Sequence, residues 1–454
     1  MRLELSPTAV RSRRLFSSDG RSGRAPQVLL LVLLATASAL SSAAEDTTTK
    51  APLGISETRR ALIDTRMREA VDAGLMSGAQ ALVAQQGKVL LRAEWGFADR
   101  ESQTGFTDNT LFRIYSMSKP VTSVALLTLY EQGHFLLGDP VAKYLPEFKD
   151  LKRLAVDEQG REILVTPARP PTIRDLLRHT AGLTYGIFGN TSVDQRYRKA
   201  DLLRVPDLAT FTSKLSELPL QYDPGSRWHY SVSVDVQGRL IEVLSGKSFG
   251  AYLKQMIFEP LAMTSTGFRV GEDRTADLAQ LYTPAGANMD WGSVYPDTTE
   301  SSLEVADPAL TKPYLEGGTF ESGGAGLVST LDDYLRFAQM LANGGELDGV
   351  RILSPQTVKL LRSDHLAGID ASGLWSMDGF GLGVGVINDP AGRSGELGGS
   401  GTYGWGGAAG TDFWIDPENS VVGVFMIQSI PHRTTLSEIF RNMIYASLLP
   451  ASPE

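Results

Sequence analysis

The sequence predicts a composite of the α+β and α/β classes, with one antiparallel β-sheet built from the N- and C-terminal segments of the mature chain. Two observations predict this fold. Strand patterns lie within residues 58–115 and again within 376–448, and the region of about 120–325 shows mostly helical and loop patterns. Separate segments can share one sheet when the chain between them folds into its own layer. We therefore expect helices to flank the sheet and a mostly helical part to be inserted between its strands.

The N-terminus is predicted to be a signal peptide. Residues 1–24 carry six Arg against two acidic residues, and 25–44 is an uncharged, apolar stretch that ends in small residues. This pattern is typical of a secretory signal, so we expect export to the periplasm or the medium after cleavage near Ala43 or Ala44. The apolar run is too short to span a bilayer comfortably, so no membrane span is expected in the mature chain. The export route, general or twin-arginine, stays open.

Hydrophobic spacing predicts the elements that follow a polar leader at 45–57. Apolar residues at helical spacing predict helices at 58–75, 116–133, 329–344, 354–361 and 435–448. Short apolar runs bounded by turn residues predict strands at 78–84, 88–95, 380–387, 403–415 and 421–428, the first two joined as a hairpin. Residues 139–266 are expected to form helices and loops, and 270–320 to be irregular. All of 58–448 is expected to belong to one catalytic domain.

Composition excludes several classes of function. Lys and Arg number 43 against 52 Asp and Glu, a net charge of −9, which argues against nucleic acid as a partner. The chain has no Cys, so it has no disulfide, thiolate metal site or Cys nucleophile. Its five His are not spaced as a metal pair. We therefore expect neither a metal nor an organic cofactor.

The first candidate for chemistry is Ser116-Met-Ser-Lys119, at the start of the predicted helix 116–133. Residues three apart share a helical face, so the Lys119 ammonium can lie beside the Ser116 hydroxyl. The helix N-terminus would also favour developing negative charge there. The motif is short, however, and a capping serine followed by an unrelated lysine is the simpler interpretation of the tetrapeptide alone.

A second candidate nucleophile is Ser248, in the Gly-x-Ser-x-Gly pattern of Gly246-Lys-Ser-Phe-Gly250. In α/β-hydrolases that motif needs a strand that leads through a sharp turn into a helix. Here the preceding residues 236–244 have helical spacing. We therefore interpret this motif as a corner between two helices.

Six stretches taken together resemble the serine β-lactamase-like hydrolases, and within them the class C β-lactamase-related carboxylesterases of family VIII. The stretches run in order along the mature chain at 112–120, 172–183, 224–232, 260–268, 323–333 and 405–417. One short motif is weak evidence, but six in order favour the resemblance strongly. It implies the β-lactamase/transpeptidase-like fold. His179 and Asp175 belong to the second stretch, where a structural role is expected.

Position by position, the resemblance implies that Ser116 is the nucleophile and Lys119 its cationic neighbour. It implies that Tyr230 is a general base, held as or near phenolate by Lys119. Whether Tyr230 or Lys119 takes the serine proton stays open. The oxyanion hole would be formed by the backbone N–H groups of Ser116 and Ala408. The implied substrate-binding positions are Trp405, Gly406, Gly407 and Val232.

Two departures from the lactamase pattern concern the substrate. Val232 stands where class C β-lactamases have an Asn that can bind an acylamino side chain. Trp405-Gly406-Gly407 replaces a cation and a hydroxyl that would bind a substrate carboxylate. Each lost charge-assisted hydrogen bond is worth roughly 1.5–3 kcal/mol. Both changes favour uncharged acyl esters.

The sequence thus predicts an exported serine carboxylesterase that acts on a small-molecule ester through an acyl-enzyme on Ser116. One alternative is a β-lactamase or a D-amino-acid peptidase or transpeptidase. Another is a catalytically inactive binding protein of the same fold, although Ser116, Lys119 and Tyr230 are all present. The natural acyl chain, the balance between hydrolysis and acyl transfer, and the oligomeric state stay open.

Overall fold

The computed structural model describes residues 54–285, 302–316, 320–375, 377–432 and 434–448, which belong to one compact unit. The predicted signal peptide at 1–44 lies outside the described residues. Among the residues that are described, no helix is both long and apolar enough to cross a bilayer.

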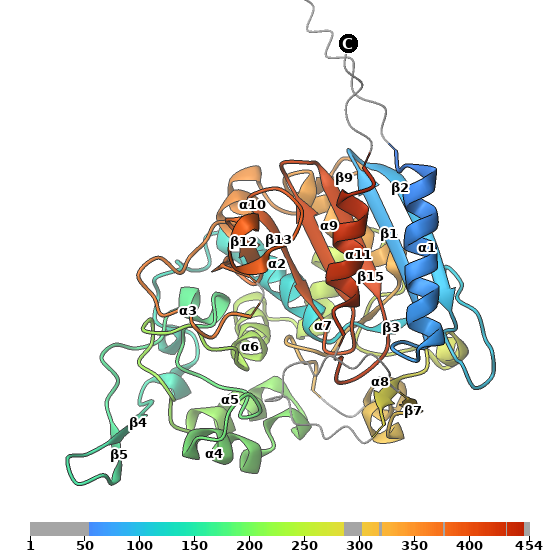
Figure 1. Cartoon of the computed structure of the whole chain (residues 1–454). Helices are drawn as coiled ribbons and strands as arrows, with labels where there is room; N and C mark the ends of the chain where they lie inside the picture. Colours follow the sequence, from blue (N-terminus) through green and yellow to red (C-terminus); the bar gives the residue numbers. More distant parts are fainter. Residues whose placement is uncertain (1–53, 286–301, 317–319, 376, 433, 449–454) are drawn as a thin grey trace, which may run out of the picture. The chain divides into compact units, whose positions relative to one another are not determined.

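The centre of the fold is a seven-stranded antiparallel sheet with the order β11-β12-β13-β14-β15-β1-β2 (Figure 1). Its strands are β1 (Gly78–Gln85), β2 (Lys88–Gly96), β11 (Gly379–Phe380), β12 (Gly385–Ile387), β13 (Thr402–Gly406), β14 (Asp412–Asp416) and β15 (Val421–Met426). The N-terminal hairpin joins the C-terminal strands where β1 pairs with β15, with Leu82 opposite Val424. The prediction of one sheet built from both ends of the chain is therefore confirmed.

The C-terminal half of the sheet has two more strands than the sequence patterns predict. The predicted strand at 380–387 is interrupted between β11 and β12, where Gly383 has a φ of +89° that favours glycine. The predicted strand at 403–415 is likewise divided by a turn into β13 and β14. Both turns are rich in small residues, so the apolar pattern continues through them without marking the break.

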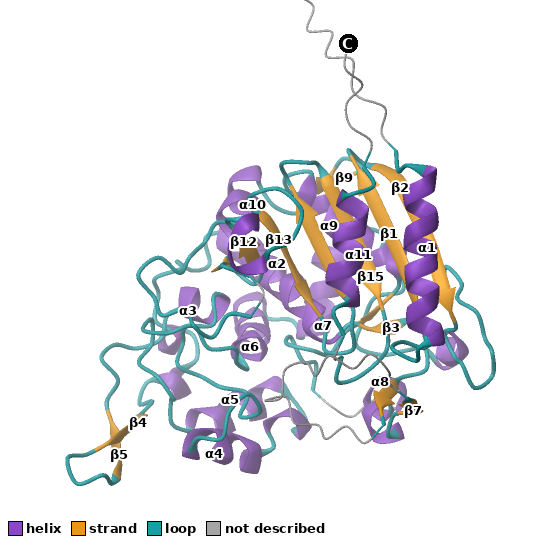
Figure 2. Ribbon diagram, in the orientation of Figure 1, coloured by secondary structure: helices purple, strands orange, loops and turns teal. Residues whose placement is uncertain are grey.

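Helices cover both faces of the sheet (Figure 2). On one face, α1 (Glu57–Asp72) and α11 (Leu436–Tyr445) bury an apolar cluster that includes Met67, Trp414 and Phe440. On the other face, α9 (Leu331–Ala342) contacts β1, β14 and β15, and α2 (Ser118–Glu131) contributes to the same larger core. The 3-10 turn η1 (Tyr115–Met117) directly precedes α2.

The region between the two halves of the sheet is mostly helical. Its helices are α3 (Ile173–Leu177), α4 (Ser192–Ala200), α5 (Leu208–Ser216), α6 (Ser233–Ser245), α7 (Phe249–Leu253), α8 (Lys312–Glu316) and, after α9, α10 (Pro355–Leu361). Short strand pairs join β3 (Phe112–Arg113) to β8 (Val328–Ser329), β4 (Arg153–Val156) to β5 (Glu162–Val165), β6 (Tyr282–Pro284) to β7 (Leu303–Val305), and β9 (Glu346–Leu347) to β10 (Val350–Arg351). The β4–β5 hairpin was not predicted. Helix α6 packs against α2, and the candidate site lies between these two helices.

Candidate active site

Ser116 lies in η1, at the point where the chain passes from β3 into α2. The preceding residue, Tyr115, has a φ of +40°, in the left-handed region that a bulky side chain seldom adopts. Such strain persists only where the surrounding structure enforces it, and it concentrates at functional sites. The helix that the sequence predicts from residue 116 therefore begins with a strained turn that carries the serine.

The structure brings Ser116 and Lys119 into contact. The Lys119 ammonium nitrogen Nζ lies 3.0 Å from Ser116 Oγ and donates to the carbonyl oxygen of Gly324 at 2.7 Å. Lys119 is 1% exposed, and this burial lowers its pKa to about 7, although the nearby Asp235 carboxylate opposes the shift. A substantial fraction of Lys119 is therefore neutral near neutral pH and can accept the serine proton.

Tyr230 lies beside this pair, although it is more than a hundred residues away in the chain. Its ring centroid is 4.6 Å from Lys119 Nζ. Burial raises the pKa of the Tyr230 phenol, while hydrogen bonds with Ser116 and Trp405 act in the opposite direction. The protonated phenol is therefore the resting form, which differs from the phenolate that the resemblance implied. Desolvation of the buried phenolate is the dominant effect, and Lys119 is only partly charged near neutral pH.

Trp405, on β13, contacts Tyr230 directly. The indole Nε1–H donates to the Tyr230 hydroxyl oxygen at 3.0 Å, and the two ring centroids are 5.5 Å apart. The sequence alone indicated only that Trp405 replaces a cation. The contact shows that its N–H group also occupies a lone pair of the phenol oxygen, which directs the phenol proton away from Trp405.

Gly406 is the last residue of β13 and Gly407 is the first residue after it, and the two glycines differ in what surrounds them. A Cβ atom at Gly407 would lie 2.1 Å from Thr411 Oγ1 and 2.5 Å from the carbonyl oxygen of Ile114. At Gly406 the nearest atom would be 3.4 Å away, an ordinary contact. Gly407 thus allows the β13–β14 turn to pack against the backbone just before Ser116. The resemblance implies that both glycines bind substrate, and the atoms closest to Gly407 belong to the protein itself.

The β13–β14 turn is held from a second direction. The carbonyl oxygen of Ala408 accepts from the backbone N–H of His432, and that of Ala409 accepts from Ser429. Among the described residues, the Ala408 amide has no hydrogen-bond partner of its own. An amide that is fixed by its neighbours and unbonded is the kind of donor that stabilises an oxyanion.

The remaining predicted positions lie around this centre. Val232 is 1% exposed and precedes α6, so its side chain packs in the core next to Tyr230. Asp175 is buried and accepts hydrogen bonds from Arg169, Arg178 and neighbouring Thr residues, which is a structural network. His179 packs against the Tyr230 ring at 4.9 Å. Ser248 caps the N-terminus of α7 by accepting from the Ala251 amide, as expected of a helix corner.

Sequence reasoning missed a buried carboxylate next to Lys119. Asp235 is fully buried in the first turn of α6, and its Oδ1 accepts from Ser322 Oγ at 2.6 Å and from the Gly324 amide at 3.1 Å. Its other oxygen, Oδ2, has no partner among the described residues. Burial raises the pKa of Asp235, and the charge of Lys119 lowers it. The sequence carries no signal for it, because Asp235 looks like part of a polar surface together with the residues on the same helical face, Gly238, Arg239 and Glu242.

Sequence reasoning also missed an aromatic wall around Tyr230. The Tyr230 ring lies 5.1 Å from Trp375, 5.3 Å from Tyr185 and 5.6 Å from Phe188, all measured between ring centroids. Trp375 is 43% exposed, so this wall opens to solvent. In the part of the chain that the structure describes, no cluster of three or more His, Asp or Glu residues could hold a metal ion.

Comparisons with known proteins identify the family of this chain. The Beta-lactamase family model matches residues 63–437. The chain belongs to the beta-lactamase family. It is 34% identical over 402 residues to Protein Rv1367c of Mycobacterium tuberculosis, covering 86% of this chain and 95% of that protein. It is also 34% identical to Esterase EstB of Burkholderia gladioli, covering 78% of this chain and 87% of EstB.

A solved structure supports the same assignment. EstCE1, described as a hydrolase with promiscuous acyltransferase activity, superimposes with a TM-score of 0.69 at 26% identity. The alignment covers 86% of this chain and 98% of EstCE1. The β-lactamase-like fold and the expectation of a serine hydrolase of this family are therefore confirmed.

Proposed function

We propose that this protein is an exported carboxylesterase that forms an acyl-enzyme on Ser116. The observation that carries the proposal is the 3.0 Å contact between Ser116 Oγ and a fully buried Lys119 whose pKa is lowered to about 7. A buried amine that is partly neutral beside a serine hydroxyl is suited to general-base catalysis. Export rests on the signal pattern of residues 1–44.

In the acylation step, neutral Lys119 accepts the proton of Ser116 as Oγ attacks the ester carbonyl carbon. The amides of Ser116 and Ala408 bind the oxyanion that develops on the carbonyl oxygen. The bond between the carbonyl carbon and the alcohol oxygen then breaks. Tyr230 donates its phenol proton to the departing alcohol and recovers a proton from the Lys119 ammonium. Acyl–Oγ and alcohol are the products.

In the deacylation step, water attacks the acyl–Oγ carbonyl and Lys119 accepts a proton from the water. The carboxylic acid leaves, and Ser116 regains its hydroxyl proton. EstCE1 is described as a hydrolase with promiscuous acyltransferase activity. By analogy, an alcohol in place of water would give an ester product through the same steps.

The site favours esters over β-lactams. Trp405 provides an indole N–H that is already bonded to Tyr230, and Val232 is a buried aliphatic side chain. Neither position offers the cation or amide that would bind a carboxylate or an acylamino group. An acidic substrate would therefore leave its charge unpaired in a largely apolar, aromatic site.

The experiment is hydrolysis of p-nitrophenyl acetate by the purified mature protein. We expect turnover in the parent, none above background in Ser116→Ala, and parental kcat in the matched control Ser248→Ala. Full activity of Ser116→Ala, or its loss only in Ser248→Ala, would overturn the proposal. A parent with no turnover of any ester would support an inactive binding protein.

The same preparations separate an esterase from a β-lactamase. We expect nitrocefin turnover to be slow or undetectable when p-nitrophenyl acetate is hydrolysed. Efficient nitrocefin hydrolysis would show that the interpretation of Trp405 and Val232 is wrong.

A further inference from the structure

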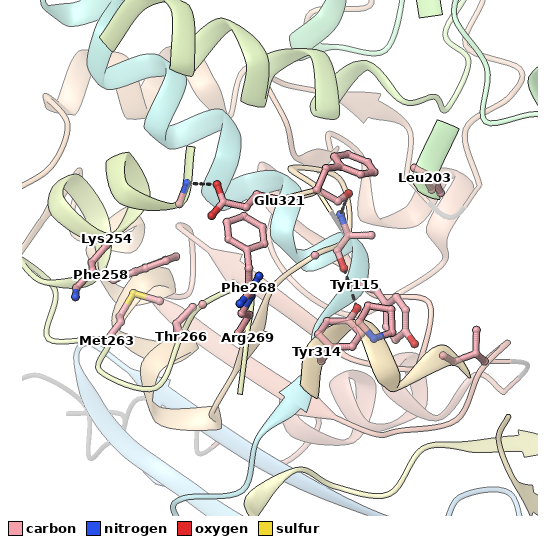
Figure 3. A pocket seen from close by; sticks show the side chains of 18 of the residues that line it. Tyr115, Leu203, Lys254, Phe258, Met263, Thr266, Phe268, Arg269, Tyr314 and Glu321 are labelled. Atoms are coloured by element: carbon pink, nitrogen blue, oxygen red, sulfur yellow. Dashed lines mark hydrogen bonds between the residues drawn. The ribbon is translucent and has the colours of Figure 1, made fainter. Parts of the chain in front are cut away.

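A cavity of about 890 Å³ lies outside the group of Ser116, Lys119 and Tyr230 (Figure 3). Its lining is largely apolar and includes Phe258, Met263, Phe268, Leu310 and Phe320. Its volume falls in the range of pockets that bury small organic ligands. The cavity is therefore large enough to hold an extended aliphatic chain.

Five charged residues line this cavity in the described part of the chain. Four of them, Arg204, Lys254, Glu259 and Arg269, are exposed to solvent. Glu321 is half-buried in the wall, where its carboxylate accepts a hydrogen bond from the Gly250 amide at 2.7 Å, drawn as a dashed line in Figure 3. Of the two carboxylates in the lining, Glu321 is bonded to the protein and Glu259 is exposed to solvent, so the less exposed part of the lining suits a neutral, apolar group.

Two residues of the cavity wall lie next in the chain to Ser116 and to the hydrogen-bond partner of Lys119. Tyr115, which lines it, directly precedes Ser116 and packs against the same small apolar cluster as Ala408. Ala325, which also lines it, follows Gly324, whose carbonyl oxygen accepts from Lys119. The cavity wall therefore comes within one residue of Ser116, and its lining residues Tyr115 and Leu310 pack against the same small cluster as Ala408.

The aromatic wall borders Tyr230, which we place at the leaving alcohol. Trp375 and Phe188 belong to that wall, and neither lines the cavity. Two regions of different shape therefore flank the serine. An ester has two parts, and the part next to the oxyanion donors is its acyl group.

We propose that the cavity bounded by Tyr115, Gly267, Phe268 and Phe320 binds the acyl chain of the ester. The substrates would then be esters of medium- to long-chain aliphatic acids. This inference rests on the proposed acyl-enzyme at Ser116. Burial of each methylene is worth about 0.8 kcal/mol, or roughly fourfold in kcat/KM, until the cavity is filled. Methylenes of the acyl chain that extend beyond the cavity into water would not raise kcat/KM further.

Gly267 offers a way to fill the cavity without disturbing the fold. Gly267 lines the cavity, and a Cβ atom there would meet no atom within 4 Å. Its backbone is extended enough to form two hydrogen bonds with Val328. Gly138 has the same open surroundings but lies on the surface beyond the far end of α2, so Gly138→Leu is the matched control for Gly267→Leu.

The experiment compares two ester series. In p-nitrophenyl esters from acetate to decanoate, the alcohol is constant and the acyl chain grows. In alkyl acetates from ethyl to octyl, the acyl group is constant and the alcohol grows. We expect Gly267→Leu to lower kcat/KM for the octanoate at least tenfold relative to acetate. The kcat/KM values of Gly267→Leu for p-nitrophenyl acetate and for all alkyl acetates should stay within about twofold of those of the parent. The kcat/KM values of Gly138→Leu should stay within about twofold of the parent values for every ester.

Three results would overturn the inference: an unchanged octanoate-to-acetate ratio in Gly267→Leu, an equal loss for every ester, or a loss confined to long alkyl acetates. The last would assign the cavity to the alcohol. Calorimetric titration with octanamide, a neutral and slowly reacting mimic of the acyl part, tests the cavity without catalysis. The parent and Ser116→Ala should bind octanamide and Gly267→Leu should bind it at least tenfold more weakly. Equal binding by all three would also overturn the inference.

These measurements separate the two proposals. Absence of p-nitrophenyl acetate turnover with normal octanamide binding would refute the esterase mechanism alone. Acetate turnover without any dependence on acyl chain length would refute the acyl cavity alone.

Discussion

Replacement of Gly407 by Ala should impair catalysis through the backbone. The new Cβ atom would lie 2.5 Å from the carbonyl oxygen of Ile114 and 2.1 Å from Thr411 Oγ1. Carbon and oxygen atoms seldom approach closer than about 3.0 Å, so the turn must move by roughly 0.5 Å or more. The turn that must move carries the Ala408 amide. The Ile114 backbone against which it packs leads into Ser116.

The expected magnitude follows from the role of the amide. Removal of one oxyanion donor costs about 10²–10³ in kcat, or roughly 2.7–4 kcal/mol. A partial displacement of Ala408 should therefore lower kcat for p-nitrophenyl acetate by at least about tenfold. KM should change much less, because the oxyanion forms only in the transition state.

Gly406→Ala is the matched control. Its Cβ atom would be 3.4 Å from the nearest atom, the carbonyl oxygen of Thr411. The two variants add one methyl group at adjacent positions, the last residue of β13 and the residue after it, so their kcat values and melting temperatures can be compared directly. A Gly407→Ala enzyme with kcat within twofold of the parent would refute the reasoning, as would an equal loss in Gly406→Ala.

Three further predictions concern the surroundings of Ser116, and a fourth concerns the cap of α7. Because neutral Lys119 is the proposed base and its pKa is about 7, kcat/KM should rise with pH through that value. Asp235→Asn removes a negative charge that raises this pKa, so the midpoint should move to lower pH, and an unmoved midpoint would contradict the role of Asp235. Trp405→Phe removes the N–H donor to Tyr230. The kcat should then fall about 3- to 10-fold, as expected for the loss of one hydrogen bond of about 1 kcal/mol. A parental kcat would argue against a role of the Trp405 N–H group in catalysis. Ser248→Ala should lower the free energy of unfolding by about 1 kcal/mol through loss of a helix cap, measured by urea denaturation, and no loss would contradict the cap.

The local parts of the site were predictable from sequence, because they depend on helical spacing. Ser116 and Lys119 are three residues apart at a helix start, and the structure places their polar atoms 3.0 Å apart. Tyr230 could be named only through the family resemblance, since no local pattern connects it to residue 116. Its hydrogen bond with Trp405 joins residues 175 positions apart and depends on how the loop before α6 lies against β13.

Other features could not be predicted because opposing effects decide them. The charge state of Tyr230 depends on whether desolvation outweighs hydrogen bonds, and that balance needs the burial of the folded protein. The division of 403–415 into two strands depends on the close approach of Gly407 to Ile114, which the apolar pattern does not encode. The β4–β5 hairpin leaves Val156 and Leu164 more than half exposed, so its apolar residues do not mark a core.

Covalent labelling tests the central claim most directly. The mature protein would be treated with a fluorophosphonate probe, digested and analysed by mass spectrometry. The account predicts one phosphonylated residue, Ser116, with labelling that follows the same rise near pH 7 as ester hydrolysis. A label on Ser248, or no label in folded protein that hydrolyses esters, would contradict it.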